Sequence, residues 1–209
     1  HTQWFLDIFK KSPFFAKKNS NLLFPHTRRV NGEDLYSSFL QKEISDLVVI
    51  NFPGAPPDEK FVMHNKFAYI LAKIWQKFGQ KINSGPLEKL ENEFTKTYGE
   101  KINVQEIVRF RYVYFLISYF QYYFLFKYIK PKKIFLVAGY IHPHLIAAAQ
   151  KQNIPVIELQ HGVITPYHLG YSYPGRPFVH YQPNELWCFG RYWYETTELP
   201  KNMSPKIVG

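Results

Sequence analysis

The sequence predicts an α/β fold in which a parallel sheet is flanked by helices, and two observations lead to this expectation. First, residues 133–138 and 156–159 are short apolar runs typical of buried strands, and the intervening residues 143–152 have a helical pattern. Strand, helix and strand in this order favour parallel pairing with a right-handed crossover. Second, a strand at 186–189 and a short helix at about 191–197 continue the alternation.

The front half of the chain adds two strands of the same kind. The first is "NLLF", residues 21–24, and the second is "DLVVINF", residues 46–52, a β-branched run. The second run is closed by "PGAPP", residues 53–57, whose prolines and glycine stop further pairing. We therefore expect a Rossmann-like sheet that includes both.

Three helices are expected between these strands and residue 133. Residues 61–78 carry apolar side chains at helical intervals and end at Gly79, a natural helix C-cap. A charged amphipathic helix, "LEKLENEFTKTYG", begins after Ser84. A long aromatic helix near 104–130 is stopped by Pro131.

The longest apolar run lies in that aromatic helix. It reads "YVYFLISYFQYYFLF", residues 112–126, and Gln121 interrupts it. A helix that spans a bilayer needs about 20 apolar residues, so we interpret this shorter run as a buried helix. A role for its tyrosines at a membrane surface is the second interpretation.

The chain is basic and holds one cysteine. Lys and Arg number 26 and Asp and Glu number 16, which gives a net charge of +10 and a field that attracts nucleic acid, anionic lipid or phosphorylated substrates. The basic residues are scattered as pairs without a nucleic-acid-binding signature, so no specific nucleic acid is expected as a partner. Cys188 alone cannot form an internal disulfide or a thiolate zinc site. No stretch at the start has the order of a signal peptide, and we expect a cytoplasmic, reducing setting.

The domain organisation follows from the end of the sequence. Residues 1–204 are expected to form one Rossmann-like N-terminal domain. The tail "SPKIVG" has the composition of a linker that enters another strand. We expect residues 205–209 to lead into a C-terminal domain that is outside this chain.

Candidate functional residues follow the predicted strands, because ligands of open parallel sheets bind beyond the carboxyl ends of the strands. His161 stands at the tip of the strand 156–159, and Gly162 allows the backbone to turn or to approach a ligand. Three other strand ends carry histidines, glycines and arginines toward the same edge. They supply His26, Arg28 and Arg29; Gly139, His142 and His144; and Arg191.

The sequence lacks the motifs of metal sites and of several common enzyme classes. His142 and His144 are two residues apart, and neither an HExxH motif nor a carboxylate cluster accompanies them, so no metal site is expected. The chain also has no GxGxxG, Walker or GxSxG motif. A dinucleotide oxidoreductase, a P-loop NTPase and an α/β-hydrolase are therefore disfavoured.

The stretches "IPVIELQHGVITPYHLGYSYP", "PNELWCFGRYW" and "SPKIVG" resemble the N-terminal half of bacterial two-domain (GT-B) glycosyltransferases of capsule, O-antigen or lipooligosaccharide synthesis. The resemblance covers residues 133–209 well and the front half weakly. It implies that this domain binds the acceptor glycan and that the C-terminal domain binds the nucleotide-sugar donor. It also implies that this chain alone is inactive and needs no cofactor besides the donor substrate.

The resemblance further implies roles for individual residues. His161 is the candidate catalytic base or transition-state hydrogen-bond donor, because imidazole titrates near working pH. If the reaction retains configuration, His161 would instead bind a phosphate or acceptor group. Glu158 is the second catalytic candidate, although strand alternation could turn it away from the cleft. The candidate substrate-binding residues are His26, Arg28, Arg29, Gly139, His142, His144, Gly162, Thr165, Tyr167, His168, Tyr171 and Arg191, and Tyr173 joins Tyr167 and Tyr171 as a residue that could stack on sugar rings.

The resemblance also bears on partners and on competing functions. Glycans of this class are built on lipid carriers, so peripheral attachment to the anionic inner membrane face is expected. The His-Gly pair also resembles poly(glycerol phosphate) transferases of wall teichoic acid synthesis. A sugar-nucleotide epimerase of similar fold and a basic, non-enzymatic binding module are two further candidate functions.

Overall fold

The computed structural model describes residues 10–26, 28, 34–52, 60–78 and 84–208. The chain divides into two compact units. The first unit comprises residues up to 64 and from 119 onward, and the second comprises residues 65–118. The predicted turn at 53–57, the predicted helix end at Gly79 and the candidate residue Arg29 lie outside the described residues.

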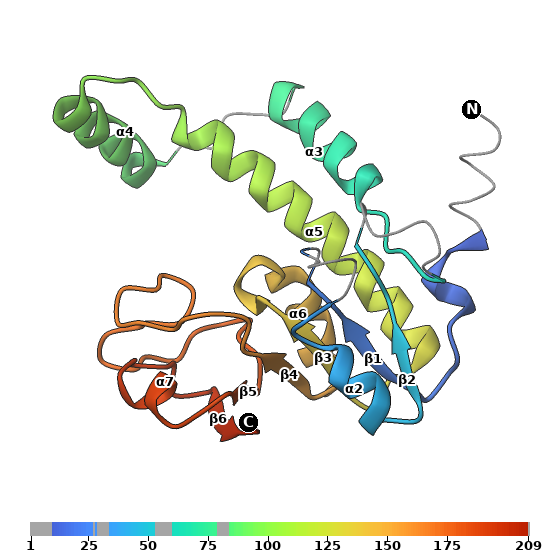
Figure 1. Ribbon diagram of the computed structural model, residues 1–209. Coiled ribbons are helices and arrows are strands. Elements are labelled where there is room, and N and C mark those ends of the chain that lie inside the picture. The colour runs from blue at the N-terminus through green and yellow to red at the C-terminus, as the bar shows by residue number, and fades with distance from the viewer. Residues whose placement is uncertain (1–9, 27, 29–33, 53–59, 79–83, 209) are drawn as a thin grey trace. The chain divides into compact units, whose positions relative to one another are not determined.

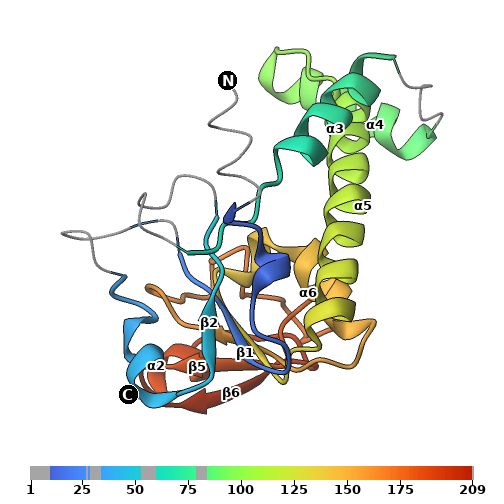
Figure 2. The same ribbon diagram turned by 90° about the vertical axis from the view of Figure 1, so that its right-hand side faces the viewer.

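The first unit is built on one sheet of six parallel strands in the order β2-β1-β3-β4-β5-β6 (Figures 1 and 2). This confirms the predicted α/β fold with a Rossmann-like sheet. The strands are β1 (Asn21–Phe24), β2 (Leu47–Val49), β3 (Ile134–Val137), β4 (Val156–Leu159), β5 (Glu185–Cys188) and β6 (Ser204–Ile207).

The strand order places a topological switch point between β1 and β3. After β1, the chain forms β2 on one side, then crosses over and forms β3 on the other side of β1. Leu23 of β1 pairs with Phe135 of β3, and Leu136 of β3 pairs with Glu158 of β4. All carboxyl ends therefore meet at one edge, where ligands of such sheets bind.

Alternating strand residues bury both faces of the sheet. Leu22, Ile134 and Val156 face one side, where α6 (Pro143–Gln150) and the 119–129 part of α5 (Val104–Ile129) cover them. Leu23 and Phe135 face the other side, where α2 (Ser38–Glu43) contributes Leu40. The continuous apolar run of β3 and the mostly apolar runs of β1 and β4 reflect this burial on both faces, and Glu158 is the polar exception in β4.

The long aromatic helix forms near its predicted residues but is only partly buried: Tyr122, Leu125 and Phe126 lie in the core, whereas Phe120 and Phe124 are exposed. It ends where proline chemistry requires it. Lys130, directly after α5, adopts a left-handed backbone with φ of 55°, and its N–H still bonds to the carbonyl of Phe126 at 2.8 Å. A residue before proline avoids the right-handed helical region, so Pro131 forces this exit. Among the described residues, none of the helices combines the length and the apolar character needed to cross a bilayer.

The second unit consists of helices. It contains α3 (Lys66–Phe78), α4 (Gly85–Tyr98) and the first half of α5. Within it, the rings of Tyr69 and Phe110 meet edge to face at 5.6 Å, and Arg109 Nη1 donates to the carbonyl of Gln76 at 3.4 Å. The charged helix predicted after Ser84 is α4, which buries none of its side chains and ends at Gly99 with φ of 72°.

The element boundaries differ from the predicted ones at several places, and β2 is shorter, Leu47–Val49 against the predicted 46–52. Two differences bear on the organisation of the chain. The helix expected at 61–78 begins at Lys66, because Phe61, Val62 and Met63 are buried in an extended segment in which Val62 pairs with Asn51. Residues 204–207, expected at the boundary of a linker, form β6 and pair with β5. The predicted boundary between residues 204 and 205 therefore falls inside a strand of this sheet.

Candidate functional site

Histidine side chains from two strands that are not neighbours meet at the switch point. His26 follows β1 and His161 follows β4, with β3 lying between these strands. Their rings are stacked with centroids 5.7 Å apart and planes 14° apart. Since adjacent strands are about 4.8 Å apart, the two side chains must extend toward each other across the carboxyl end of β3 to make this contact.

Tyrosines surround the two imidazoles. Tyr36, from the turn before α2, packs its ring edge to face against His26 at 5.8 Å and against His161 at 6.0 Å. Tyr140, from the short 3₁₀ turn η2 (Gly139–Ile141), lies 6.1 Å from His161 and 5.5 Å from Tyr171 between ring centroids. We name the group of His26, Tyr36, Tyr140, His161, His168 and Tyr171 the His161 cluster.

Glu158 lies beneath this cluster and is wholly buried. Its Oε1 accepts hydrogen bonds from the backbone N–H of Gly139, at 2.8 Å, and from the hydroxyl of Tyr171. Burial raises the pKa of Glu158 to about 7, against the opposing effect of these two hydrogen bonds. Glu158 therefore does not reach the open edge of the sheet, and it contacts the cluster through Tyr171.

Gly139 is required by this arrangement. A β-carbon at residue 139 would lie 2.6 Å from Oε2 of Glu158, 3.0 Å from Pro183 and 3.1 Å from Leu136. Only a residue without a side chain lets the exit of β3 approach the carboxyl group closely enough to bond to it. The predicted functional glycine is thus a packing requirement of the Glu158 site.

His161 sits between this buried network and the open edge of the sheet. Its Nδ1 is 3.4 Å from the hydroxyl oxygen of Tyr171, and the ring is partly buried. The pKa of His161 is lowered, first by burial and then by His26 and His168. Burial and the nearby carboxylate raise the pKa of Tyr171, so its hydroxyl keeps the proton that it donates to Glu158.

Gln160 anchors the turn that carries His161. Its Nε2 donates to the carbonyl of Gly162 at 2.8 Å, and its Oε1 accepts from the backbone N–H of Phe189 at 2.9 Å. The side chain is buried and so connects the end of β4 to the end of β5. Sequence reasoning did not identify this role, because the partner, Phe189 directly after β5, is 29 residues away along the chain.

The loop after β4 places His168 and Tyr171 in the cluster. His168 Nδ1 accepts from the N–H of Gly170 at 3.1 Å, which makes a tight turn before Tyr171. A β-carbon on Gly170 would lie 2.6 Å from the ring of Tyr140, so this glycine allows Tyr140 to pack closely. Tyr171 is buried with Leu186 and Cys188 in a hydrophobic cluster separate from the two clusters that cover the faces of the sheet.

Two predicted histidines belong to the protein interior more than to the cluster. The ring of His142 stacks on Phe52 at 4.3 Å with planes 6° apart, and His144 is buried 5.5 Å from the ring of Tyr122. Burial lowers the pKa of His142 to about 3 and that of His144 to about 4. Both rings remain neutral at physiological pH and pack as aromatic side chains.

The other predicted residues lie on the surface or near the rim. Arg28 is exposed, and its backbone N–H donates to Nδ1 of His26 at 2.9 Å. Arg191 is exposed and pairs with Glu195 at 3.8 Å.

Tyr167 is 90% exposed beside Thr165, whose Oγ1 accepts the N–H of Tyr167 at 3.3 Å. The hydroxyl of Tyr173 accepts a hydrogen bond from Gln182 at 2.8 Å. Gly162 is exposed and its Cα has open space around it.

The predicted site residues thus separate into two groups. The structure brings His26, Gly139, Glu158, His161, His168 and Tyr171 together. Tyr36, Tyr140 and Gln160 belong to the same site but were not predicted, since aromatic and amide side chains in loops give no periodic signal. Across the described residues, no three His, Cys, Asp or Glu side chains are arranged to hold a metal ion.

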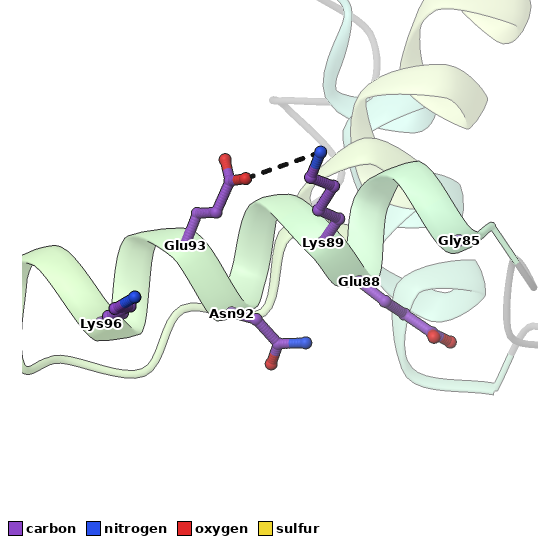
Figure 3. Close-up of a pocket in the computed structure, with 6 residues that line it drawn as sticks. All are labelled: Gly85, Glu88, Lys89, Asn92, Glu93 and Lys96. Atoms are coloured by element: carbon purple, nitrogen blue, oxygen red, sulfur yellow. Dashed lines mark ion pairs between the residues drawn. The ribbon is translucent and has the colours of Figure 1, made fainter.

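A separate hollow in the second unit lacks such convergence. Figure 3 shows that the residues lining it, from Gly85 to Lys96, all belong to α4, with an ion pair of 3.8 Å between Lys89 and Glu93. Because one exposed helix supplies every lining side chain, no second element positions groups around a ligand. The His161 cluster is therefore the stronger candidate site.

Comparison with known protein families, with curated proteins and with solved structures finds no match for this chain.

Proposed function

We infer that this chain is the acceptor-side domain of a GT-B-type glycosyltransferase that adds a sugar to a growing bacterial surface glycan. The observation that carries the proposal is the position of His161. It stands at the carboxyl edge of a parallel sheet, stacked on His26, with its Nδ1 3.4 Å from a tyrosine hydroxyl that is bonded to a buried carboxyl group. The sequence resemblance supplies the reaction class.

In direct displacement, His161 acts as the general base. The acceptor hydroxyl oxygen forms a bond to the anomeric carbon of the donor, and the nucleotide diphosphate leaves with the electron pair of the broken C–O bond. The hydroxyl proton passes to Nε2 of His161. A lowered pKa suits this role, because the imidazole is already unprotonated at neutral pH and ready to accept that proton.

The other members of the cluster bind the acceptor in this proposal. Tyr140 is 37% exposed and its ring lies beside the rings of His161 and His168, so it offers an aromatic surface for a sugar ring. Nε2 of His26 would bind the acceptor, since its Nδ1 already accepts a hydrogen bond from the N–H of Arg28. The nucleotide-sugar donor would bind chiefly to a C-terminal domain outside this chain, and no cofactor is required.

A surface of the first unit is suited to an anionic membrane. Phe14, Phe124 and Tyr128 are between 41% and 56% exposed, and the rings of Phe14 and Tyr128 meet at 6.0 Å. Nζ of Lys18 lies 4.1 Å above the ring of Tyr128. We name Phe14, Phe15, Lys17, Lys18, Phe120, Phe124, Lys127 and Tyr128 the aromatic–basic surface.

The charge around this surface favours anionic lipid. The segments 10–26 and 119–133 contain lysines but neither aspartate nor glutamate. Exposed aromatic rings beside lysines fit the membrane interface, where one end of the ring is apolar and the other is hydrated. In the proposed function this surface would hold the enzyme at the inner membrane face, where lipid-linked acceptors are found.

Donor turnover by the full-length protein tests the function. We expect transfer or hydrolysis with one member of a panel of nucleotide sugars, and His161→Ala should lower kcat by about 10²- to 10⁴-fold, the usual contribution of a general base. His180→Ala is the matched control, because the ring of His180 packs against Phe178 and Tyr181, in the loop before β5 and outside the His161 cluster.

The outcomes distinguish the candidate functions. Full activity of His161→Ala at an unchanged melting temperature would remove His161 from the chemistry. Donor turnover without an acceptor, with isomerised product, would identify an epimerase, and turnover only with a glycerol phosphate donor would identify the teichoic-acid-type transferase. No turnover with any donor would contradict an enzymatic role and favour a binding module.

A further inference from the structure

Three side chains form a continuous hydrogen-bonded chain from the core to the site edge. Oε1 of Glu158 accepts the hydroxyl proton of Tyr171, and the same hydroxyl oxygen lies 3.4 Å from Nδ1 of His161. Because the Tyr171 hydrogen is directed at the carboxyl group, only the oxygen lone pairs face His161. The contact can therefore be a hydrogen bond only when Nδ1 of His161 carries the hydrogen.

We propose that Tyr171 and Glu158 are positioning residues that hold His161 in the tautomer with its hydrogen on Nδ1, and so leave the Nε2 lone pair available at the edge of the sheet. This inference rests on the proposed function for its use in catalysis, but the tautomer itself is independent of any activity. The ring nitrogen that carries the proton in a histidine is set by the partner of the other nitrogen.

The direction of the chain is fixed when Glu158 is ionised. A carboxylate oxygen can only accept hydrogen bonds, so Oε1 accepts from both Gly139 and Tyr171. In the protonated acid, a proton on Oε1 could instead be donated to Tyr171, because Oε2 has no hydrogen-bond partner among the described residues. Above the Glu158 pKa of about 7, Tyr171 is therefore the donor, and its oxygen remains an acceptor toward His161.

The neighbouring histidines have the opposite tautomer, which gives internal references. Nδ1 of His26 accepts from the N–H of Arg28, and Nδ1 of His168 accepts from the N–H of Gly170. Both of these rings must carry the hydrogen on Nε2 when neutral. His161 is then the member of the cluster whose hydrogen bond requires the reverse arrangement.

The groups that face His161 come from every element packed around it. His26 stacks on the ring, Tyr36 and Tyr140 contact its edges, and His168 acts through its charge. The hydroxyl of Tyr171 lies in hydrogen-bonding range of Nδ1. The neighbouring rings set how readily His161 is protonated, whereas Tyr171 determines which nitrogen holds the hydrogen of the neutral ring.

Nitrogen-15 NMR of the histidine rings in this chain tests the proposal without any substrate. At a pH above the Glu158 pKa of about 7, where the carboxyl group is ionised and the histidine rings are neutral, we expect a protonated, pyrrole-type signal from Nδ1 of His161 and a pyridine-type signal from its Nε2. His26 and His168 should show the reverse pattern in the same spectrum. Loss of one set of signals in His161→Gln assigns the resonances.

Two variants separate geometry from charge. Tyr171→Phe removes the acceptor and should move His161 to the Nε2-protonated form or to a mixture, while His26 and His168 keep their signals and so report that the fold persists. Glu158→Gln keeps an oxygen acceptor for Tyr171 and should leave the His161 tautomer unchanged. If Tyr171→Phe does not fold, the wild-type spectrum and Glu158→Gln still decide the question.

Two results would contradict the proposed tautomer. A wild-type His161 with its hydrogen on Nε2, or a tautomer unaffected by Tyr171→Phe, would overturn the proposal whatever the activity of the protein. Conversely, the expected tautomer with no turnover of any sugar nucleotide would leave the positioning network standing and contradict the proposed function alone.

Discussion

At the scale of single residues, the burial of Glu158 makes the stability of the site depend on pH. The carboxyl group is inaccessible to water and faces the same side of β4 as the buried Val156. Two hydrogen bonds to Oε1 offset only part of the cost of charging it, so the pKa rises from 4.5 to about 7. The network beneath His161 is therefore sensitive to pH.

The sign of this sensitivity can be predicted. The folded state binds the Glu158 proton more tightly than the unfolded state, so the stabilising contribution is complete below pH 4.5 and is lost as pH rises through about 7. The loss amounts to roughly 3 kcal/mol at most, from 1.36 kcal/mol for each pKa unit. Between pH 4.5 and pH 8, we expect the free energy of unfolding of the wild type to fall by this amount relative to that of Glu158→Gln.

Urea denaturation at these two pH values measures the effect. Glu43→Gln is the matched control, since Glu43 is exposed at the end of α2, and its difference from the wild type should be small at both pH values. A stability difference between Glu158→Gln and the wild type that does not change with pH would show that the buried carboxyl group ionises as freely as it does in the unfolded chain.

Residue by residue, the sequence predicted the site only in part. His26 and His161 were predicted because each stands just after a strand end, and His168 was predicted from the family resemblance of the loop that follows β4. The positions of Tyr36 and Tyr140 depend on turns whose direction is set by long-range packing, which no local pattern encodes. Tyr171 was predicted as a sugar-stacking residue, but its ring is buried and its hydroxyl bonds to Glu158.

At the scale of elements, the junction between β3 and α6 depends on close contact with β4. Gly139 Cα lies against Glu158, Pro183 and Leu136, with space for a hydrogen but not for a methyl group. The N–H of the same residue is one of the two donors to Glu158. The contact that packs the β3–α6 junction against β4 is therefore also part of the polar network of the site.

A methyl group at this junction should be costly. Gly139→Ala is expected to lower the free energy of unfolding by about 1–3 kcal/mol, because Glu158 or the backbone must shift in a packed core. Gly162→Ala is the matched control, because its Cα is exposed with open space around it. Equal melting temperatures for Gly139→Ala and Gly162→Ala would contradict the close approach at Gly139.

Elements with strong periodic or apolar patterns were predicted well. The buried runs of β1, β3 and β4 and the aromatic helix α5 depend on local composition, and the structure contains each of them. β6 was not predicted, because "SPKI" combines a proline with a lysine and has no apolar alternation. Its pairing depends on β5, where Glu185 Oε1 accepts from Lys206 at 2.8 Å across the two strands.

At the scale of the whole molecule, the net charge of +10 acts together with the aromatic–basic surface. Lysines on this surface add about 1 kcal/mol each to the attraction of an anionic membrane. Since exposed charges are screened by salt over about 10 Å at 0.1 M, the attraction should weaken steeply as ionic strength increases.

Vesicle cosedimentation checks this expectation. The chain should bind vesicles that contain phosphatidylserine at low salt and should be released at high salt, with little binding to neutral vesicles. Replacing both Lys17 and Lys18 by Glu should weaken binding by about 2 kcal/mol or more, roughly 30-fold. The same charge change at the exposed Lys151 and Lys201 should weaken it less.

Equal weakening by the two pairs would mean that net charge alone draws the protein to the bilayer. Absence of binding to anionic vesicles at low salt would contradict the membrane proposal.

The edge strand β6 affects how copies of this protein behave in concentrated solution. Ser204 donates its N–H to Asn184, directly before β5, and Val208 donates to Cys188 of β5, so strand alternation directs the positions of residues 205 and 207 outward. Pro205 has no N–H to offer there, which leaves Ile207 as the outward donor of β6. A second molecule that approached this edge would find one N–H donor at positions 205 and 207 instead of two. Proline at such a position is a common protection against aggregation through strand pairing.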